Sequence, residues 1–483
     1  MTVVYDPLTY RTLVSRPGEV PYKFWSVNKL VIDAAAAGIC VLHSGDAAPD
    51  DTSRLWLDLT MPENAVGSVK AYDGASWVAL TPQLFYSHIA GYDLTAFAKT
   101  MLDDENAPAV RSTIYAASFD AGASLGLLTN PHFEISQENG TTLLSAIGTT
   151  PTYAADQWRS SENSSGAASV QNAVDPFSST SGFRRLKNSV KMIATTAAAS
   201  YSSAESFNPC VQDIEGHFLK TLGFGTADAR AAVAVWIGQV SVAGTYTLTL
   251  RNGVPDRSFA SNVVLAANTP TVVLVPIAGD TSGTWASDNT RGAILTFGVV
   301  AGSSLQASTL DAWAAGNFTS HASSTNWAGT TNAFVQTAYF NLFPAGVLPF
   351  TSAAQITGEA LQLLLNMRRP YDEELRRCLR YWTKTYNYAV APGTGTLDGG
   401  FDFYVPTGGT GTFRTPVRFP VRMRTTPTVV TYDAVGAAGF VFKGGNGKTA
   451  TISETGESGC TLGTADATSA NELFFHYTAN ARM

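Results

Sequence analysis

The stretch Arg368-Arg-Pro-Tyr-Asp-Glu-Glu-Leu-Arg-Arg-Cys-Leu-Arg-Tyr-Trp382 predicts the most clearly marked helix of the chain. Pro370 suits the first turn of a helix, where its missing N–H costs nothing, and three acidic residues follow at the positive end of the helix dipole. Apolar residues recur at helical spacing along one stripe: Leu375, Cys378, Leu379 and Trp382. Because a helix this short is not stable alone in water, the stripe must pack on another part of the protein.

The sequence on both sides of this helix has the alternating pattern of β-strands. Tyr246, Leu248 and Leu250 alternate with threonines, which predicts a strand with one buried face and one solvent-facing face. Similar segments lie at Ala231–Ile237, Thr271–Val275, Ala293–Val300, Phe401–Val405, Val417–Val421, Thr428–Tyr432 and Glu472–Tyr477. Turn residues separate them, so we predict a mainly β protein with an antiparallel β-sandwich and a smaller C-terminal β-sandwich, joined by short helices. The predicted boundaries place the larger sandwich at 128–350, the helical joint at 351–385 and the smaller sandwich at 386–483.

The N-terminal part of the chain is divided into three segments. Residues 46–92 predict a small β-hairpin unit, because Asp73-Gly74 between two alternating segments favours a tight turn. Residues 93–127 predict a short helical connector of two helices, the second opened by Pro108. Residues 1–45 include the apolar run Leu30–Leu42, which fits either a buried helix or strands.

The composition favours a soluble β protein and excludes several classes of partner. Charged residues make up 14% of the chain, below the roughly one quarter of typical soluble domains. The net charge is −7 without a strong basic cluster, so nucleic acid is not an expected partner. No apolar run approaches the ~18 residues of a membrane span, and the first residues do not form a signal peptide. Four widely separated cysteines predict buried or free thiols in a protein assembled in a reducing cytoplasm.

The sequence has no arrangement of residues that predicts an enzyme. The six histidines are scattered without a metal-binding spacing, and neither a phosphate-binding loop nor a nucleophile elbow is present. A polysaccharide depolymerase would need two carboxylates across a sugar bond, and Asp398 with Asp402, or Asp280 with Asp288, are the candidates. Aspartates serve more often in turns, so we predict no catalytic residue, no cofactor and no metal.

Three tryptophans are candidates for carbohydrate binding: Trp285, Trp313 and Trp327. They lie among Gly, Asn, Ser and Thr residues outside clear strands, and sugar rings stack on exposed aromatic rings. The alternative is that these rings cover the core, because large aromatic side chains are mostly buried. Trp158, Trp236 and Trp382 are assigned to cores.

Leucine-rich segments at the joint are candidates for an oligomer or domain interface. The candidate residues are Leu361, Leu364, Leu365, Leu375, Leu379 and Trp382. One interpretation is a lid on the neighbouring sandwiches, and the other is a seam between identical chains. Both interpretations bury the same apolar stripes.

An ordered series of motifs resembles the carbohydrate-binding-module-like jelly roll of tailed-bacteriophage tail fibres and related virion proteins. The motifs are Thr129-Asn-Pro-His-Phe-Glu-Ile135, Ala155-Asp-Gln-Trp158, Leu222-Gly-Phe-Gly225, Gly279-Asp-Thr-Ser-Gly-Thr-Trp285, Ala315-Gly-Asn-Phe318 and Asn326-Trp327. Phe334–Phe350 resembles the end of that sandwich, Arg368–Trp382 its following helix, and Phe419–Val429 with Phe475–Ala481 its C-terminal β module. The chain departs from the pattern at 352–366, which looks inserted, and in Cys378-Leu-Arg-Tyr-Trp382, where the family has Cys-Gln-Arg-Tyr-Tyr.

This resemblance implies a non-enzymatic structural protein of a phage virion, most plainly a tail fibre or receptor-binding protein that adheres to host surface polysaccharide. It implies a homotrimer, with residues 1–45 attaching to other tail or baseplate proteins. The alternatives are a head-fibre, collar or baseplate decoration protein with an assembly role only, and, less favoured, a polysaccharide depolymerase. The expected location is the virion, after assembly in the host cytoplasm.

Overall fold

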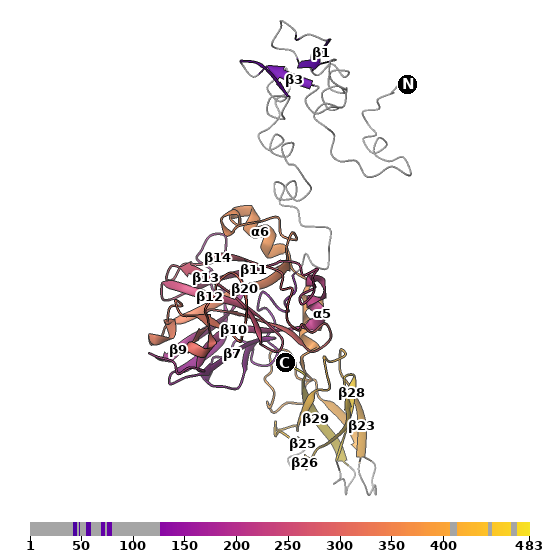
Figure 1. The fold of residues 1–483 in the computed structure, drawn as a ribbon. Helices are drawn as coiled ribbons and strands as arrows, with labels where there is room; N and C mark the ends of the chain where they lie inside the picture. The colour runs from indigo at the N-terminus through magenta and orange to yellow at the C-terminus, as the bar shows by residue number, and fades with distance from the viewer. Residues whose placement is uncertain are drawn as a thin grey trace, which may run out of the picture. The chain divides into compact units, whose positions relative to one another are not determined.

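The computed structural model describes residues 42–45, 48, 55–58, 69–72, 75–79, 126–405, 413–442, 447–464 and 471–483. The chain divides into two compact units, Met1–Ala116 and Ala117–Met483. Figure 1 shows a mainly β protein, with an antiparallel β-sandwich, smaller C-terminal sheets and a few short helices. The predicted fold class is therefore confirmed.

The described part of the first unit is a four-stranded sheet. Its strands are β1 (Leu42–Gly45), β2 (Leu55–Asp58), β3 (Val69–Tyr72) and β4 (Trp77–Ala79). β1 and β2 are parallel, whereas β2, β3 and β4 are antiparallel neighbours. Tyr72 pairs with Trp77, so β3 and β4 form an antiparallel hairpin on either side of the predicted Asp73-Gly74 turn. The run Leu30–Leu42, apart from Leu42, and the helices predicted in 93–127 lie outside the described residues.

Two antiparallel sheets form the large sandwich of the second unit. The six-stranded sheet has the order β14 (Thr271–Ile277), β11 (Ala232–Val240), β20 (Phe334–Pro344), β9 (Asn188–Thr196), β8 (Ala167–Val174) and β5 (Leu144–Ile147). The eight-stranded sheet has the order β18 (Trp313–Ala315), β13 (Arg257–Leu265), β12 (Gly244–Asn252), β15 (Arg291–Phe297), β10 (Ser206–Glu215), β7 (Trp158–Asn163) and β6 (Thr152–Ala155), and β16 (Val300–Ala301) also pairs with β10.

Aromatic rings fill the core between these two sheets. Trp236 stacks on Phe297 with ring centroids 4.1 Å apart, and Trp158 stacks on Phe340 at 5.6 Å. Both tryptophans are fully buried, as their sequence context predicts. Alternate residues of β11 and β20 therefore face this core, and the residues between them lie on the outer face of the six-stranded sheet.

The outer face of β12 differs from the sequence-based expectation. Tyr246, Leu248 and Leu250 face the core, but Thr247 and Thr249 are also 0% exposed. The Thr247 hydroxyl lies 2.5 Å from that of Ser324, and the Thr249 hydroxyl lies 2.6 Å from that of Thr296. The predicted solvent-facing side is a covered polar layer, which is stable because each threonine hydroxyl has a partner.

The C-terminal strands form two further sheets around a separate core. β21 (Trp382–Lys384), β22 (Phe401–Val405) and β24 (Thr428–Tyr432) all pair with β29 (Asn471–Asn480). The second sheet contains β23 (Phe413–Arg418), β28 (Gly459–Thr464) and β27 (Thr451–Gly456), and a short pair is formed by β25 (Phe440–Val441) and β26 (Lys448–Thr449). Val417 and Leu462 of one sheet share a core with Phe475 and Tyr477 of the other.

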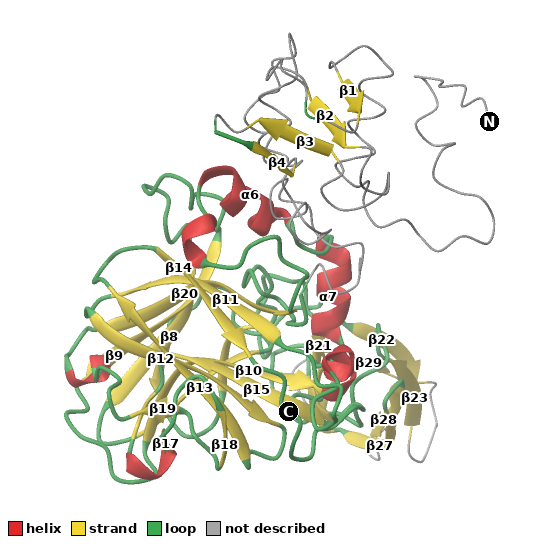
Figure 2. Cartoon of the chain, turned by 45° about the horizontal axis from the view of Figure 1, so that its top comes forward, coloured by secondary structure: helices red, strands yellow, loops and turns green. Residues whose placement is uncertain are grey.

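Two helices connect the large sandwich to these sheets (Figure 2). They are α6 (Gly358–Asn366) and α7 (Tyr371–Leu379). α7 ends before Trp382, which instead begins β21 and pairs with Asn480. Trp382 is therefore not part of the helical stripe predicted for it, because pairing with β29 replaces a further helical turn and an aromatic residue suits a strand.

Two further features concern membranes and thiols. None of the helices that the structure describes is both long and apolar enough to span a membrane. Cys210, Cys378 and Cys460 are unpaired and buried. Burial raises the pKa of each thiol above its usual value.

Candidate functional site

Trp285 and Trp313 lie together at one edge of the eight-stranded sheet and are called the tryptophan pair below. Trp313 opens the edge strand β18, and Trp285 lies in the loop between β14 and β15. Their rings are 5.4 Å apart and nearly perpendicular. Phe224 packs edge-on against both rings, at 4.8 Å and 5.7 Å, and both tryptophans are half-buried. The sequence predicted both residues as candidates, and the fold brings them into contact.

The loop that carries Trp285 is held in place by its own contacts. Arg257 makes a bidentate ion pair with Asp280, at 2.6 Å and 2.9 Å, and the Asp280 side chain is 2% exposed. Gly225 has a φ of +83°, and a Cβ there would lie 2.9 Å from the Gly283 carbonyl oxygen and 3.1 Å from Trp285 Cδ1. A glycine at position 225 therefore lets the Leu222–Gly225 loop approach Trp285.

Both indole N–H groups of the tryptophan pair donate to the backbone. Trp285 Nε1 donates to the Ser282 carbonyl at 3.2 Å, and Trp313 Nε1 donates to the Ala278 carbonyl at 2.6 Å. These bonds fix the orientation of the rings before any ligand arrives. A ligand would then be recognised through the exposed parts of the rings and not through the indole nitrogens.

Trp327 is a core residue, and its prediction as a sugar-binding residue is corrected. It lies in a 3₁₀ turn, Trp327–Gly329, and its side chain is 0% exposed. Its Nε1 donates to the Gly298 carbonyl at 2.8 Å, and Phe207 packs edge-on against the ring at 5.4 Å. A ring with no exposed surface cannot stack on a sugar, which leaves the alternative that Trp327 belongs to the core.

The three leucines of α6 pack inside one chain, against the outer face of the six-stranded sheet. Leu361, Leu364 and Leu365 are each at most 4% exposed. Their partners in this cluster include Val235 and Phe343, which point outward from β11 and β20. α6 therefore acts as a lid on the sandwich, and the interpretation of these leucines as a seam between identical chains is corrected.

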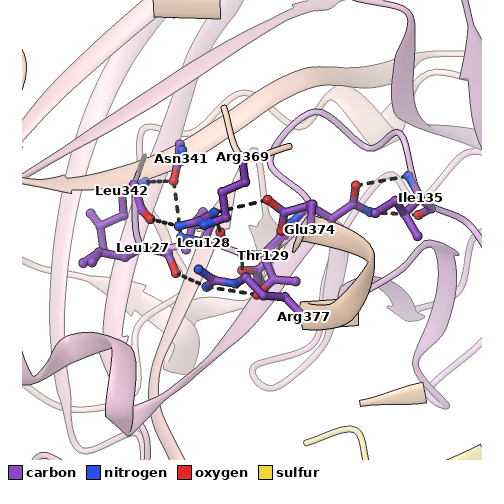
Figure 3. Close-up of polar contacts among 12 residues, drawn as sticks. Leu127, Leu128, Thr129, Ile135, Asn341, Leu342, Arg369, Glu374 and Arg377 are labelled. Atoms are coloured by element: carbon purple, nitrogen blue, oxygen red, sulfur yellow. Dashed lines mark hydrogen bonds and ion pairs between the residues drawn. The ribbon is translucent and has the colours of Figure 1, made fainter. Parts of the chain in front are cut away.

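α7 packs on the sandwich largely through its arginines (Figure 3). Arg369, just before the helix, donates to the carbonyl oxygens of Gly126 and Leu128. Arg377 donates to the Leu127 carbonyl oxygen and to the Thr129 hydroxyl. Burial and the nearby charge of Arg369 lower the pKa of Arg377 to about 10. Leu375 and Leu379, the predicted contact residues, are only half-buried, while Cys378 and Trp382 are buried.

Glu374 connects α7 to the loop of residues 130–135, which follows the carbonyl groups that Arg369 and Arg377 bind. Its Oε1 accepts from the Asn130 backbone N–H at 2.7 Å, and its Oε2 lies 3.2 Å from Arg369. Asn130 has a φ of +54°, and its side chain accepts from the Ile135 N–H at 3.1 Å. One carboxylate therefore compensates a buried guanidinium and also fixes the start of the 130–135 loop.

A buried carboxylate, Glu215, joins the end of β10 to the end of α7. Arg380 reaches it with two bonds, Nη2 to Oε1 at 2.6 Å and Nε to Oε2 at 3.0 Å. The Tyr381 hydroxyl donates to Oε2 at 2.8 Å, and the Glu215 side chain is 1% exposed. We call Glu215, Arg380 and Tyr381 the joint triad. It fixes the chain where it passes from the sandwich into the C-terminal sheets.

His132, which lies against this joint, predicts a measurable pH dependence of stability. Burial and the charge of Arg368 lower the pKa of His132 to about 3, from 6.5. Between these two values the unfolded chain binds more protons than the folded chain, so stability falls as the pH falls. We expect His132→Phe, which keeps an aromatic ring against Tyr339, to remove about 2 kcal/mol of the stability difference between about pH 8 and pH 5.

Urea unfolding of the parent protein and of His132→Phe at the two pH values measures this effect. The change from one pH to the other is compared between the proteins, so a constant packing difference cancels. Equal losses of stability in both proteins would mean that His132 does not titrate in this window.

One of the two carboxylate pairs considered for a depolymerase, Asp280 with Asp288, has structural partners in the fold. Asp280 is bound by Arg257, and Asp288 accepts bonds from the N–H and hydroxyl of Thr290 in its own turn. Within the described ranges, no group of three or more His, Cys, Asp or Glu side chains is placed to hold a metal ion.

Neither a scan against protein-family models nor a search of curated proteins finds a match to this chain. Among solved structures, the fold is distantly similar to the family 11 carbohydrate-binding module of Clostridium thermocellum in complex with a β-1,3-1,4-mixed-linked tetrasaccharide, with 13% identity, a TM-score of 0.22, and coverage of 42% of this chain and 97% of that one. For discoidin II of Dictyostelium discoideum the values are 12% identity, a TM-score of 0.13, and coverage of 64% and 88%.

An arabinose-bound α-L-arabinofuranosidase matches with 14% identity and a TM-score of 0.26, over 47% of this chain and 27% of that one. The chain thus spans about a quarter of that enzyme's length, and 30% of a Clostridium thermocellum xylanase 10B structure. At these scores the likeness concerns the β-sandwich alone.

Proposed function

We propose that this protein is a non-enzymatic structural component of a tailed-phage virion, a tail fibre or receptor-binding protein that adheres to host surface glycans. The observation that carries the adhesive part is the tryptophan pair, two half-buried rings in contact at the edge of the sandwich, one on the loop between β14 and β15 and one on the edge strand β18. The virion part is supported by the ordered sequence motifs that resemble phage fibre proteins. Recognition residues commonly sit on loops positioned by such a scaffold.

The proposed mechanism is multivalent adhesion. A sugar would stack its C–H face on the exposed parts of Trp285 and Trp313, a contact that is weak at a single site. Several copies on one particle raise the effective concentration at the host surface, so weak sites give strong attachment. We propose a homotrimer, attached through the N-terminal segment, as the unit that presents these copies.

The non-enzymatic part of the proposal is supported by the state of Asp280, one member of the candidate pair Asp280 and Asp288. Asp280 is almost fully buried and bound to Arg257, so it cannot reach a sugar bond. Incubating the protein with host capsular polysaccharide should therefore release no new reducing ends.

The adhesive role is tested by glycan-array binding of the full chain and of the variant Trp285→Ala/Trp313→Ala. We expect the variant to bind the recognised glycan at least about tenfold more weakly, since loss of two ring contacts removes on the order of 1.4 kcal/mol or more. The matched control is Trp285→Phe, which keeps an aromatic ring and should retain most binding. Unchanged binding by the double alanine variant contradicts the assignment of this site.

An assembly role without a ligand is the second candidate function. It is favoured by one observation, that both indole N–H groups of the tryptophan pair donate inward to the backbone. Such a head-fibre, collar or baseplate decoration protein would bind no host polysaccharide on the same array. The mass of the protein in solution separately tests the trimer.

A further inference from the structure

A cavity of about 600 Å³ lies between the large sandwich and the C-terminal sheets, next to the joint triad. Its lining includes Val254 at the β12–β13 turn, Thr284 and Ala286 on either side of Trp285, and Thr290 and Arg291 at the start of β15. Arg424, in the segment between β23 and β24, and Met483 line it from the C-terminal part of the chain. The loop that carries Trp285 is therefore also a wall of this cavity.

The charged side chains that line the cavity are two arginines. Arg424 donates to the carbonyl oxygens of Asn289, Ala481 and Arg482, and no carboxylate in the described part of the chain forms an ion pair with it. Arg291 donates to the Gly253 carbonyl at 2.8 Å, and its Nη1 lies 3.5 Å from Asp213 Oδ1. The cavity thus has two guanidinium groups, and the carboxylates near them, Asp213 and Glu215, are each bound to another arginine, Arg159 and Arg380.

Two further arginines beside Arg291 increase this excess of positive charge. Arg159 already holds Asp213 with two bonds, at 2.6 Å and 3.2 Å, so that carboxylate is largely neutralised. Arg251 is 7% exposed, donates to Asn317, and its Nε has no hydrogen-bond partner. Burial and the charges of Arg159 and Arg291 lower the pKa of Arg251 to about 10. A buried guanidinium without a full set of partners is costly, and a nearby anion would relieve that cost.

We propose that this cavity binds the carboxylate of an acidic sugar, a hexuronic acid residue within the glycan that the tryptophan pair contacts. Arg291 and Arg424 would hold the carboxylate, because guanidinium groups match its geometry. Val254 and Ala286 offer apolar surface to the C–H face of the sugar ring. This inference rests on the proposed adhesive function and narrows its ligand to acidic glycans.

The test uses the full chain and an oligogalacturonate of four residues, compared with its methyl ester, which has the same rings without the charges. We expect the acid to bind at least about tenfold more tightly than the ester, and this preference to shrink as salt is raised. Equal binding of acid and ester, or preference for a sulfated oligosaccharide, overturns the assignment.

Val254 allows a variant that changes the charge of the cavity without disturbing the fold, because its side chain is 78% exposed. Val254→Glu and Val254→Gln both remove the apolar contact, so each variant is judged by its preference for the acid over the ester. Val254→Glu should lower this preference by about tenfold or more, because the new carboxylate repels the charged ligand, whereas Val254→Gln, of the same size as Val254→Glu and uncharged, should keep the preference of the parent. Equal effects of the two substitutions overturn the proposal.

The outcomes also distinguish a failure of the cavity assignment from a failure of the proposed adhesive function. If a neutral glycan binds through the tryptophan pair while the acid has no advantage, the cavity assignment fails and the adhesive function stands. If neither the acid nor any other glycan binds, both fail together.

Discussion

Replacing Glu215 with alanine is expected to lower the free energy of unfolding by about 3–5 kcal/mol. The side chain is 1% exposed and accepts three hydrogen bonds, two from Arg380 and one from the Tyr381 hydroxyl. Removing it leaves the buried Tyr381 hydroxyl and the 27%-exposed Arg380 guanidinium without their shared partner. Urea or thermal unfolding, followed by circular dichroism, measures the loss.

The matched control is a second ion pair at the same joint, between Glu134 and Arg368. The two side chains lie 2.7 Å apart, but Arg368 is 52% exposed and Glu134 is 29% exposed. Water replaces such a partner readily, so Glu134→Ala should cost less than about 1 kcal/mol. Equal losses for Glu215→Ala and Glu134→Ala would show that the joint triad does not hold the two sandwiches together.

The β architecture could be predicted from the sequence because strand alternation is a local signal. Tyr246, Leu248 and Leu250 report the buried face of β12 directly, since successive side chains point to opposite sides of a sheet. The covering of the opposite face could not be predicted in the same way. Thr247 and Thr249 are buried by pairing with Ser324 and Thr296, which are distant in sequence.

The docking of α7 shows a second limit of pattern-based prediction. An apolar stripe was expected to make the contact, yet Arg369 and Arg377 are the residues that bond to the sandwich. Apart from the Thr129 hydroxyl, their partners on the sandwich are the carbonyl oxygens of residues 126–128, which have the same chemistry in every sequence. The sequence nevertheless contains a signal for this polar contact: several arginines cluster in one helix of a chain in which only 14% of residues are charged.

The candidate site was partly visible in the sequence. Trp285 and Trp313 were found from their polar, turn-rich surroundings, but Trp327 has similar surroundings and lies in the core. A short 3₁₀ turn with the Asn326 side chain as its cap orients that ring inward. The cavity between Arg291 and Arg424 depends on how two separate sandwiches meet, which no local pattern encodes.

Replacing Trp327 with alanine is expected to cost about 3–5 kcal/mol of stability, the amount typical for truncating a fully buried large aromatic side chain. The substitution removes the contact with Phe207, leaves a cavity, and deprives the Gly298 carbonyl of its donor. Trp327→Phe should lose less, because it retains most of the ring volume. Denaturant midpoints of both variants provide the measurement.

Trp285→Ala is the comparison that separates a core residue from a candidate ligand-binding residue. Trp285 is half-buried, so its truncation removes less buried surface and should cost clearly less stability than Trp327→Ala. The order of the two variants should be reversed for glycan binding. Folded Trp327→Ala should bind glycan normally, whereas Trp285→Ala should not. Because stability and binding respond to different residues, a loss of glycan binding in folded Trp327→Ala would contradict the placement of this ring in the core.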